Sequence, residues 1–314
     1  MARTFRVGTR GSILARRQTE DVIEALRKIH ENLQFEIRVV TTAGDDTKFS
    51  PIESIPGKGR FTRTLEERLA EGCIDLAVHS AKDLPSELLE GLTIGAVPAR
   101  EDPRDALISV GGKTIDALPE GSRIGTGSPR RIAQLRRIRQ DLVTVPLRGN
   151  LDTRLKRLEN REMEGIIVAA AGLIRMGWES VISEILDPKR MTPAAGQGAL
   201  IVEARENDQE VLEALQQIDH SDSRLTVDAE RAVLFHLHAG CGLPLGVFAV
   251  AEDSTLVLSG TLLSADGASA STVQLSGRKS DAARLGRRGA KRLLRRGGKE
   301  IVRAWEAEDK LCQT

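Results

Sequence analysis

The sequence predicts an α/β fold with two similar α/β domains, followed by a small C-terminal α+β domain. Three observations support this prediction. Short apolar runs alternate with helical patterns through the first two-thirds of the chain, which is typical of parallel sheets flanked by helices. A strand–turn–helix pattern occurs twice in this region. After about residue 218 the pattern changes to that of an antiparallel meander followed by a helix.

Strands are expected where short apolar runs are bounded by turn-forming residues. These runs are Phe35–Val40, Ile74–Val78, Leu92–Val97, Ala106–Val110, Arg123–Thr126, Ile166–Ala170 and Ala199–Ala204. The segments between them place apolar residues on one helical face, as Val22, Leu26 and Ile29 do.

The internal repeat consists of Arg6–Ser12 and Arg123–Ser128. Each copy has the pattern of a strand, a Gly-Thr turn and a serine that can cap the next helix. In the second copy Pro129 occupies the first helical position, where its missing N–H costs nothing. Two copies of one unit favour two similar domains. Chance similarity over about seven residues is the alternative.

Two segments rich in turn formers, residues 99–103 and 192–198, are the expected crossings between these domains. The chain would then leave the first domain, build the second and return. We expect one domain at 1–99 with 199–217 returning, a second at 100–198, and a C-terminal domain at 218–314.

The C-terminal domain is expected to contain three antiparallel strands and a basic helix. The strands are Val247–Ala251, Thr255–Leu263 and Thr272–Ser276, with a turn at Asp266-Gly267. The run from Arg278 to Arg303 carries a net charge of +9. A solvated amphipathic helix is the favoured interpretation, and nucleic-acid or membrane contact is the minor alternative.

Composition narrows the possible functions. The 314 residues have a net charge of only +1, which argues against nucleic-acid binding by the chain as a whole. The three widely spaced cysteines form neither a disulfide framework nor a metal-binding pair, so we expect no metal. No secretory signal and no apolar run of about 18 residues is present. We therefore expect a cytoplasmic protein.

Arginines gather at three expected helix starts. There are 35 arginines and 11 lysines, and residues 123–157 alone have a net charge of +8. Free N–H groups at a helix start already favour an anion, so cations there indicate a ligand with several negative groups. The residues concerned are Arg10 and Ser12, then Ser128, Arg130 and Arg131, and then Arg148 and Arg154 beside a possible cap at Asn150. The alternative is a solvated basic face, which we favour for Arg136, Arg137 and Arg139.

Candidate catalytic groups follow the strand Ile74–Val78. Functional groups in α/β sheets gather at the carboxyl ends of strands, which favours Ser80, Lys82 and Asp83. A carboxylate there could stabilise a nearby cation. The alternative is an ordinary Lys–Asp turn, and His79 alone is interpreted as structural.

Two further segments have functional patterns. Cys241 lies between two glycines, which would leave its sulfur accessible, whereas Cys73 better fits an inert buried cysteine. Residues 41–61 form a long segment rich in glycine, proline and charge, which suggests a mobile lid or plain disorder.

Together, these segments resemble the porphobilinogen deaminase family along essentially the whole chain. The matching motifs, in order, are Gly8–Ser12, Gly57–Phe61, Ala77–Pro85, Arg100–Asp105, Gly125–Arg131, Leu147–Asn150 with Thr153-Arg154, Ala170–Leu173, Gly196–Gly198 and Gly240-Cys241. One departure is Pro129, where the family commonly has an aliphatic residue.

The resemblance implies an enzyme, a hydroxymethylbilane synthase, that condenses four porphobilinogen molecules head to tail with loss of ammonia. Its product is linear hydroxymethylbilane, in tetrapyrrole and haem biosynthesis. It also implies a dipyrromethane cofactor built from two substrate units and joined to Cys241 by a thioether. The first two domains would resemble periplasmic binding proteins, in agreement with the repeat and the double crossover.

The resemblance also implies roles for individual residues. Asp83 would bind pyrrole N–H groups and stabilise the cation formed on loss of ammonia. The residues implied to hold the cofactor are Ser80, Lys82, Thr126, Ser128, Arg130 and Arg131. Those implied to bind the substrate and growing chain are Arg10, Ser12, Arg148, Arg154 and Arg175, with Lys58, Phe61 and Gln197 as second-rank candidates.

Porphobilinogen and the growing polypyrrole chain are the expected partners of a monomer that binds neither nucleic acid nor membrane. The runner-up is a non-catalytic anion or solute binder on the same two-domain scaffold, which would need neither Asp83 nor an accessible Cys241.

Overall fold

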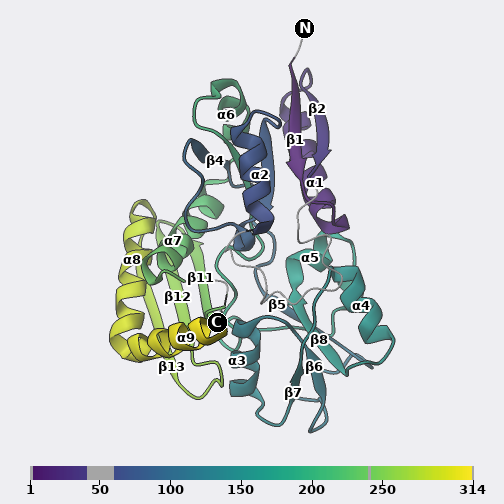
Figure 1. The fold of residues 1–314 in the computed structure, drawn as a ribbon, viewed down its shortest axis with the longest axis vertical. Coiled ribbons are helices and arrows are strands. Elements are labelled where there is room, and N and C mark those ends of the chain that lie inside the picture. The colour runs from purple at the N-terminus through teal and green to yellow at the C-terminus, as the bar shows by residue number, and fades with distance from the viewer. Residues whose placement is uncertain (1–2, 41–59, 240–241, 313–314) are drawn as a thin grey trace. The chain divides into compact units, whose positions relative to one another are not determined.

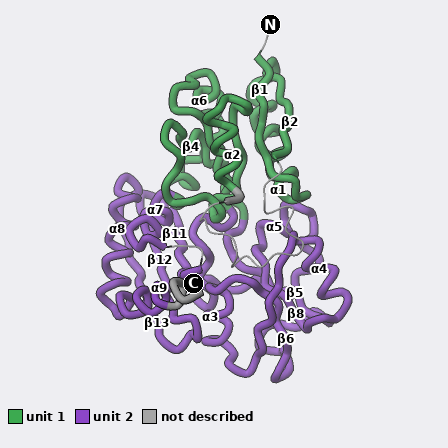
Figure 2. Tube along the Cα trace, in the orientation of Figure 1, with its two compact units in different colours: residues 1–101, 199–227 green, residues 102–198, 228–314 purple. Residues whose placement is uncertain are grey.

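The computed structural model describes residues 3–40, 60–239 and 242–312. This part of the chain forms two compact units (Figure 2). Unit 1 comprises residues 1–101 and 199–227, and unit 2 comprises residues 102–198 and 228–314. The chain therefore leaves unit 1, builds part of unit 2 and returns, as the double crossover predicts. The three-domain division with its expected boundaries stays a prediction.

Unit 1 contains a five-stranded sheet in the order β2-β1-β3-β10-β4. Its strands are β1 (Thr4–Thr9), β2 (Gln34–Val39), β3 (Leu76–Ser80), β4 (Leu92–Ala96) and β10 (Leu200–Arg205). Its helices are α1 (Ile13–Ile29), α2 (Arg60–Ala70) and α6 (Gln209–Gln216), with a 3₁₀ turn η2 (Ala81–Asp83) directly after β3. Side chains alternate along β3, so its two faces join different cores. Val78 packs with α1 and α6, whereas Ala77 packs with α2.

Unit 2 contains a second five-stranded sheet, in the order β7-β6-β8-β5-β9. Its strands are β5 (Asp105–Ser109), β6 (Arg123–Gly125), β7 (Val143–Val145), β8 (Gly165–Ala169) and β9 (Glu184–Ile185). Its helices are α3 (Pro129–Ile138), α4 (Leu151–Glu159) and α5 (Ala170–Arg175), with a 3₁₀ turn η3 (Glu179–Val181) after α5. The order of strands repeats that of the first sheet, because β6, β7 and β8 take the places of β1, β2 and β3. The predicted repeat is therefore a repeat of whole sheets.

The prediction of parallel sheets was wrong for one strand in each sheet. β10 runs antiparallel to β3 and β4, and β5 runs antiparallel to β8 and β9. Both strands follow a crossing segment. A strand runs parallel to its neighbour only if a connection, usually a helix, first returns the chain to the end of the sheet where that neighbour began. The crossing segments provide no such return, so β5 and β10 run antiparallel to their neighbours.

The remainder of unit 2 is the C-terminal region. Helix α7 (Ser221–Leu237), which begins in unit 1, leads to the antiparallel strands β11 (Leu245–Glu252), β12 (Thr255–Leu263) and β13 (Ala270–Arg278). A 3₁₀ turn η4 (Lys279–Asp281) then leads to α8 (Ala282–Leu293), which lies along this sheet (Figure 1). The expected meander and the α/β class with a small C-terminal sheet and helix region are thereby confirmed.

The single basic helix expected at the C-terminus is interrupted. α8 continues through η5 (Leu294–Gly298) into α9 (Lys299–Cys312), and the chain kinks inside η5. Gly297 has a φ of 93°, in the left-handed region that glycine adopts without strain. The basic side chains of α8 lie at the surface, as predicted.

Candidate functional site

The site residues predicted in unit 1 gather at one edge of its sheet. β1 and β3 are adjacent and parallel, so their carboxyl ends meet at the same edge. Arg10 and Ser12 follow β1, and the segment from Ser80 to Asp83 ends β3 and forms η2. The structure therefore brings these residues to one place within unit 1.

The first helix start is capped as predicted. The hydroxyl of Ser12 accepts a hydrogen bond from the backbone N–H of Ala15 at 3.2 Å, and α1 has no acidic residue in its first turn. Arg10 is half-buried at the end of β1. This start presents a guanidinium beside a capped helix N-terminus, which suits a carboxylate ligand.

Ser80 links the end of β3 to α1. Its hydroxyl lies 3.0 Å from the side-chain amide nitrogen of Gln18. Ala81 donates its backbone N–H to the carbonyl of Ala199 at 3.0 Å, which ties η2 to the returning chain. Lys82 and Asp83 are exposed at this rigid edge. Their charged groups are therefore open to a ligand while their backbone is held on both sides.

The site residues predicted in unit 2 gather in the same way. β6, β7 and β8 are parallel, and the segments after their carboxyl ends carry the predicted residues. These are Thr126, Ser128, Arg130 and Arg131 after β6, Arg148 and Arg154 after β7, and Arg175 after β8. The antiparallel strand β5 begins at this edge with Asp105, which pairs with Ala169.

A buried cluster of charged groups lies at the start of α3. Arg130, Arg131 and Asp105 are each 6% exposed or less. Nη1 of Arg130 donates to Oδ2 of Asp105 at 2.7 Å and to the carbonyl of Thr192 at 2.8 Å. Arg131 donates to Oδ1 of Asp105 from Nε at 2.9 Å and from Nη2 at 2.7 Å. One carboxylate thus orients both guanidinium groups.

The electrostatics of this cluster favour a further anion. Burial alone would raise the pKa of Asp105, but the attraction of the two arginines outweighs it and holds the pKa well below its usual range. Burial lowers the pKa of Arg131, although an arginine stays protonated at any ordinary pH. Two cations and one carboxylate leave an excess positive charge in a buried place. The donor set therefore fits a carboxylate-bearing group such as a dipyrromethane.

The helix cap at Ser128 is confirmed, whereas the cap expected at Asn150 forms only in part. The Ser128 hydroxyl accepts from the backbone N–H of Arg131 at 3.5 Å. Thr126 is buried, and its hydroxyl accepts the N–H of Ser128 at 3.2 Å. Asn150 occupies the N-cap position of α4, but its side chain accepts no cap hydrogen bond.

The remaining arginines at this edge differ in exposure. Arg148 is exposed, and Arg154 is half-buried with its Nε 2.8 Å from the carbonyl oxygen of Gly149. Arg175 donates from Nη2 to the carbonyl of Gly198 at 2.8 Å. Arg139, expected on a solvated face, instead donates to the carbonyls of Ile115 and Leu118.

Gln197 belongs to the buried cluster. It is 1% exposed, and its side-chain amide donates to Oδ1 of Asp105 at 3.0 Å and to the carbonyl of Pro103 at 2.7 Å. Its oxygen lies 3.4 Å from Nη2 of Arg131. Its place is therefore beside the arginines that would hold the cofactor.

Sequence reasoning missed two acids that organise this region. Asp105 had a signal, since it is the last residue of the Arg100–Asp105 motif and the first residue of a buried strand. Glu230 lies in the middle of α7 and had none. Its carboxylate is fully buried and accepts the backbone N–H groups of Gly196 at 2.6 Å and Ala249 at 2.7 Å. It thus fixes the segment that carries Gln197.

Three predicted residues cannot be placed. Lys58 and Cys241 lie outside the described residues, as does the side chain of Phe61. Cys73, expected to be buried, is exposed. It lies before the strand, as expected, but in the turn that follows α2 (which ends at Ala70), and this turn is at the surface.

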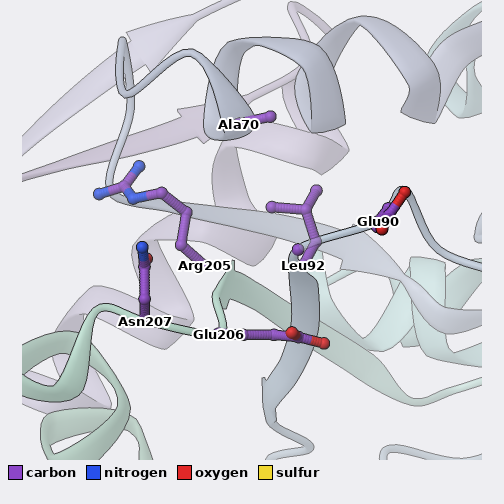
Figure 3. Close-up of a pocket in the computed structure, with 7 residues that line it drawn as sticks. Ala70, Glu90, Leu92, Arg205, Glu206 and Asn207 are labelled. Carbon is purple, nitrogen blue, oxygen red and sulfur yellow. The ribbon is translucent and has the colours of Figure 1, made fainter.

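A cavity elsewhere in unit 1 contains none of the predicted site residues. It has a volume of about 240 Å³ and lies where Leu92 pairs with Arg205, at the edge of the sheet opposite Ser80. Figure 3 shows Arg205 directed away from Glu206. Arg205 donates to the carbonyls of Leu69 and Ile74, so it supports the fold.

Two negative findings apply to the described part of the chain. No group of three or more His, Cys, Asp or Glu side chains there could hold a metal ion. No helix in that part is long and apolar enough to cross a membrane.

Comparisons with known proteins identify close relatives. The profile described as "Porphobilinogen deaminase, dipyromethane cofactor binding domain" matches residues 5–213, and "Porphobilinogen deaminase, C-terminal domain" matches residues 224–295. The porphobilinogen deaminase of Syntrophobacter fumaroxidans is 44% identical over 91% of this chain and 92% of its own. That of Bacillus subtilis is 45% identical over 85% of this chain and 86% of its own.

Among solved structures, the chain resembles the BvgS VFT2 domain of Bordetella pertussis, with a TM-score of 0.41 and 14% identity over 68% of this chain and 86% of that one. An arginine-specific periplasmic binding protein of Salmonella typhimurium gives a TM-score of 0.41 and 16% identity over 68% of this chain and 90% of that one.

Proposed function

The chain belongs to the porphobilinogen deaminase family, and on this premise we propose how its residues divide the work of a hydroxymethylbilane synthase. The reaction condenses four porphobilinogen molecules head to tail and releases one ammonia for each. One water supplies the terminal hydroxyl of the product, linear hydroxymethylbilane. Family membership favours this function over the non-catalytic solute binder.

The main support for this assignment of residue roles is the buried cluster around Asp105. Each pyrrole bears an acetate and a propionate, so a ligand of several pyrroles requires several cationic partners. Arg130 and Arg131 are already oriented by Asp105 and retain an excess positive charge. Such preorganised donors bind a carboxylate without further ordering. We assign the cofactor's carboxylates to these two arginines, with Ser80, Lys82, Thr126 and Ser128 as further cofactor ligands.

The cofactor, when bound, supplies the terminal pyrrole to which substrate units are added. We propose that it is attached to Cys241 through a thioether. The sequence supports this assignment, since Cys241 lies between Gly240 and Gly242, which have no side chains that could cover it.

Asp83 is the proposed catalytic residue. Loss of ammonia from the aminomethyl group leaves a cation that is shared with the pyrrole ring. An exposed carboxylate on a fixed backbone can accept the pyrrole N–H and stabilise that cation. Asp83 would thus hold the cation beside the pyrrole that is extended, where a C–C bond could form as the free α-carbon of that pyrrole lost its proton.

The substrate and growing chain are assigned to the arginines and polar groups at the two sheet edges. These are Arg10, Ser12, Arg148, Arg154 and Arg175, with Gln197, Lys58 and Phe61 as lesser contributors. We further propose that the protein acts in the cytoplasm as a monomer.

The intact mass of the purified protein tests this function. Protein from cells that make porphobilinogen should carry a covalent excess equal to two condensed pyrrole units. The excess should be absent from Cys241→Ala and retained in Cys73→Ala, which removes an exposed thiol elsewhere. An unmodified wild-type mass from such cells would contradict the proposal.

A further inference from the structure

Three ionisable side chains are buried together in unit 1 beneath α2. His79 of β3, Glu203 of β10 and Glu66 of α2 are each 4% exposed or less. Glu203 pairs in register with Ala77, which packs against α2, and His79 lies two residues further along β3 on the same face. The group therefore occupies a core that is otherwise built from Leu65, Leu69 and other apolar side chains.

The side chains of His79 and Glu203 are in close contact but form no well-aligned hydrogen bond. Nε2 of His79 lies 2.8 Å from Oε2 of Glu203. Within the described part of the chain, neither carboxylate oxygen of Glu203 nor this nitrogen has a hydrogen bond of good geometry. A buried pair of this kind contributes little net stability, and apolar residues of similar volume would often serve the fold as well or better. Stability alone does not account for it.

Glu66 adds to the cost of the cluster. Its Oε1 accepts the backbone N–H of Leu89 at 3.1 Å. Burial, followed by the nearby charge of Glu203, raises the pKa of Glu66, while His79 and Arg63 act in the opposite direction. These are the titratable groups of α2, β3 and β10 that act on one another here.

The cluster is adjacent in the sequence to two segments with predicted functions. His79 directly precedes Ser80 and is four residues before Asp83. Helix α2, which carries Glu66, begins at Arg60, directly after the segment that contains Lys58. His79 is the last buried residue of β3, and its contact with Glu203 joins β3 to the neighbouring strand β10. The contact therefore lies just before η2, which carries Lys82 and Asp83.

We propose that His79 and Glu203 are positioning residues, whose buried contact sets the end of β3 so that Lys82 and Asp83 are held in their reactive orientation. This inference rests on the proposed function, in which Asp83 touches the substrate. Loss of the contact shifts the end of the strand slightly without unfolding the unit.

The test compares a double variant, His79→Leu with Glu203→Met, with the wild-type holoenzyme. Its urea midpoint should equal or exceed that of the wild type, because two poorly satisfied buried charges are removed together. Its kcat should fall between about tenfold and a hundredfold, as expected for a misplaced catalytic group, with little change in KM. Thr19→Val, a buried isosteric change in α1, is the matched control and should leave kcat unchanged.

Conservative variants of Glu203 separate positioning from packing. Glu203→Gln keeps the shape of the side chain but replaces its carboxyl with an amide. It should reproduce the lower kcat with little change in KM, while Glu203→Asp should restore part of the lost kcat.

A wild-type kcat in the double variant would overturn this inference. If the double variant fails to fold, a wild-type kcat in Glu203→Gln would overturn it instead. Either result would leave the proposed function untouched. The proposed function would fail separately, if the wild-type enzyme released no ammonia from porphobilinogen.

Discussion

Oδ1 of Asp105 accepts two hydrogen bonds from Arg131, one from Nε at 2.9 Å and one from Nη2 at 2.7 Å. Because Arg131 uses only this oxygen, Oδ2 is left for Arg130. Neither arginine can then reorient without breaking a buried charged contact. A ligand carboxylate would meet guanidinium groups whose rotamer entropy has already been lost, which favours tight binding.

Replacement of Asp105 by Asn should destabilise the protein strongly. The change leaves two guanidinium groups buried with no anion, and removal of one partner from a buried ion pair costs about 3–5 kcal/mol. Urea unfolding of the purified variant measures this loss. Asp116→Asn is the control, since that carboxylate is exposed and binds Arg190 at the surface. Its cost should stay within about 1 kcal/mol. Equal effects at the two positions would contradict the structural role of Asp105.

Acid should weaken unit 1 through Asp75. Burial would raise the pKa of this carboxyl, but hydrogen bonds from Arg6 and Arg3 lower it well below its usual range. A depressed folded-state pKa contributes stability above the unfolded value, near 4, and this stability is lost as the pH falls. The free energy of unfolding should therefore decline below about pH 4 in the wild type. Asp75→Asn should show a shallower decline, and an unchanged slope would exclude this origin.

Much of the fold could be predicted from local patterns. Ser12 and Ser128 cap the helices where the Gly-Thr turns placed them, because an N-cap needs only the residues next to it. Most strands also lie where the sequence predicted them, although the short strands β7 and β9 were missed. Gly267 has a positive φ in the turn expected at Asp266-Gly267. These features depend on short stretches of chain.

Features that depend on distant partners could not be predicted in this way. The opposite direction of β5 and β10 follows from the path of the crossings, which leaves no local pattern. Likewise, Asp105 and the two arginines are 25 and 26 residues apart, and only the fold brings them together. The break at Gly297 was missed because Leu293 and Leu294 before it and Ile301 and Val302 after it continue the apolar pattern.

Arg131→Leu should prevent assembly of the cofactor. The change removes one of the two buried cations proposed for the cofactor's carboxylates, and Asp105 then neutralises the other. The purified variant should have the mass of the unmodified chain. Arg137→Leu, on the exposed side of the same helix, should keep the full covalent excess. An excess in Arg131→Leu equal to that of the wild type would remove Arg131 from the cofactor site.

Asp83→Asn should abolish turnover while the fold remains intact. The side chain is exposed, so its charge contributes little to folding, and the change should alter stability by no more than about 0.5 kcal/mol. The amide cannot neutralise a cation on the pyrrole. We therefore expect kcat to fall by at least about a hundredfold, the loss typical when a preorganised electrostatic partner is removed.

The release of ammonia from porphobilinogen measures this loss, with circular dichroism as the check on folding. Glu87→Gln is the matched control, because Glu87 is also an exposed acid shortly after η2. Both substitutions remove one negative charge from this edge, but only Asp83 is proposed to contact the substrate. Glu87→Gln should therefore turn over at the wild-type rate. If Asp83→Asn and Glu87→Gln were equally active, stabilisation of the cation would have to come from another group at the sheet edge.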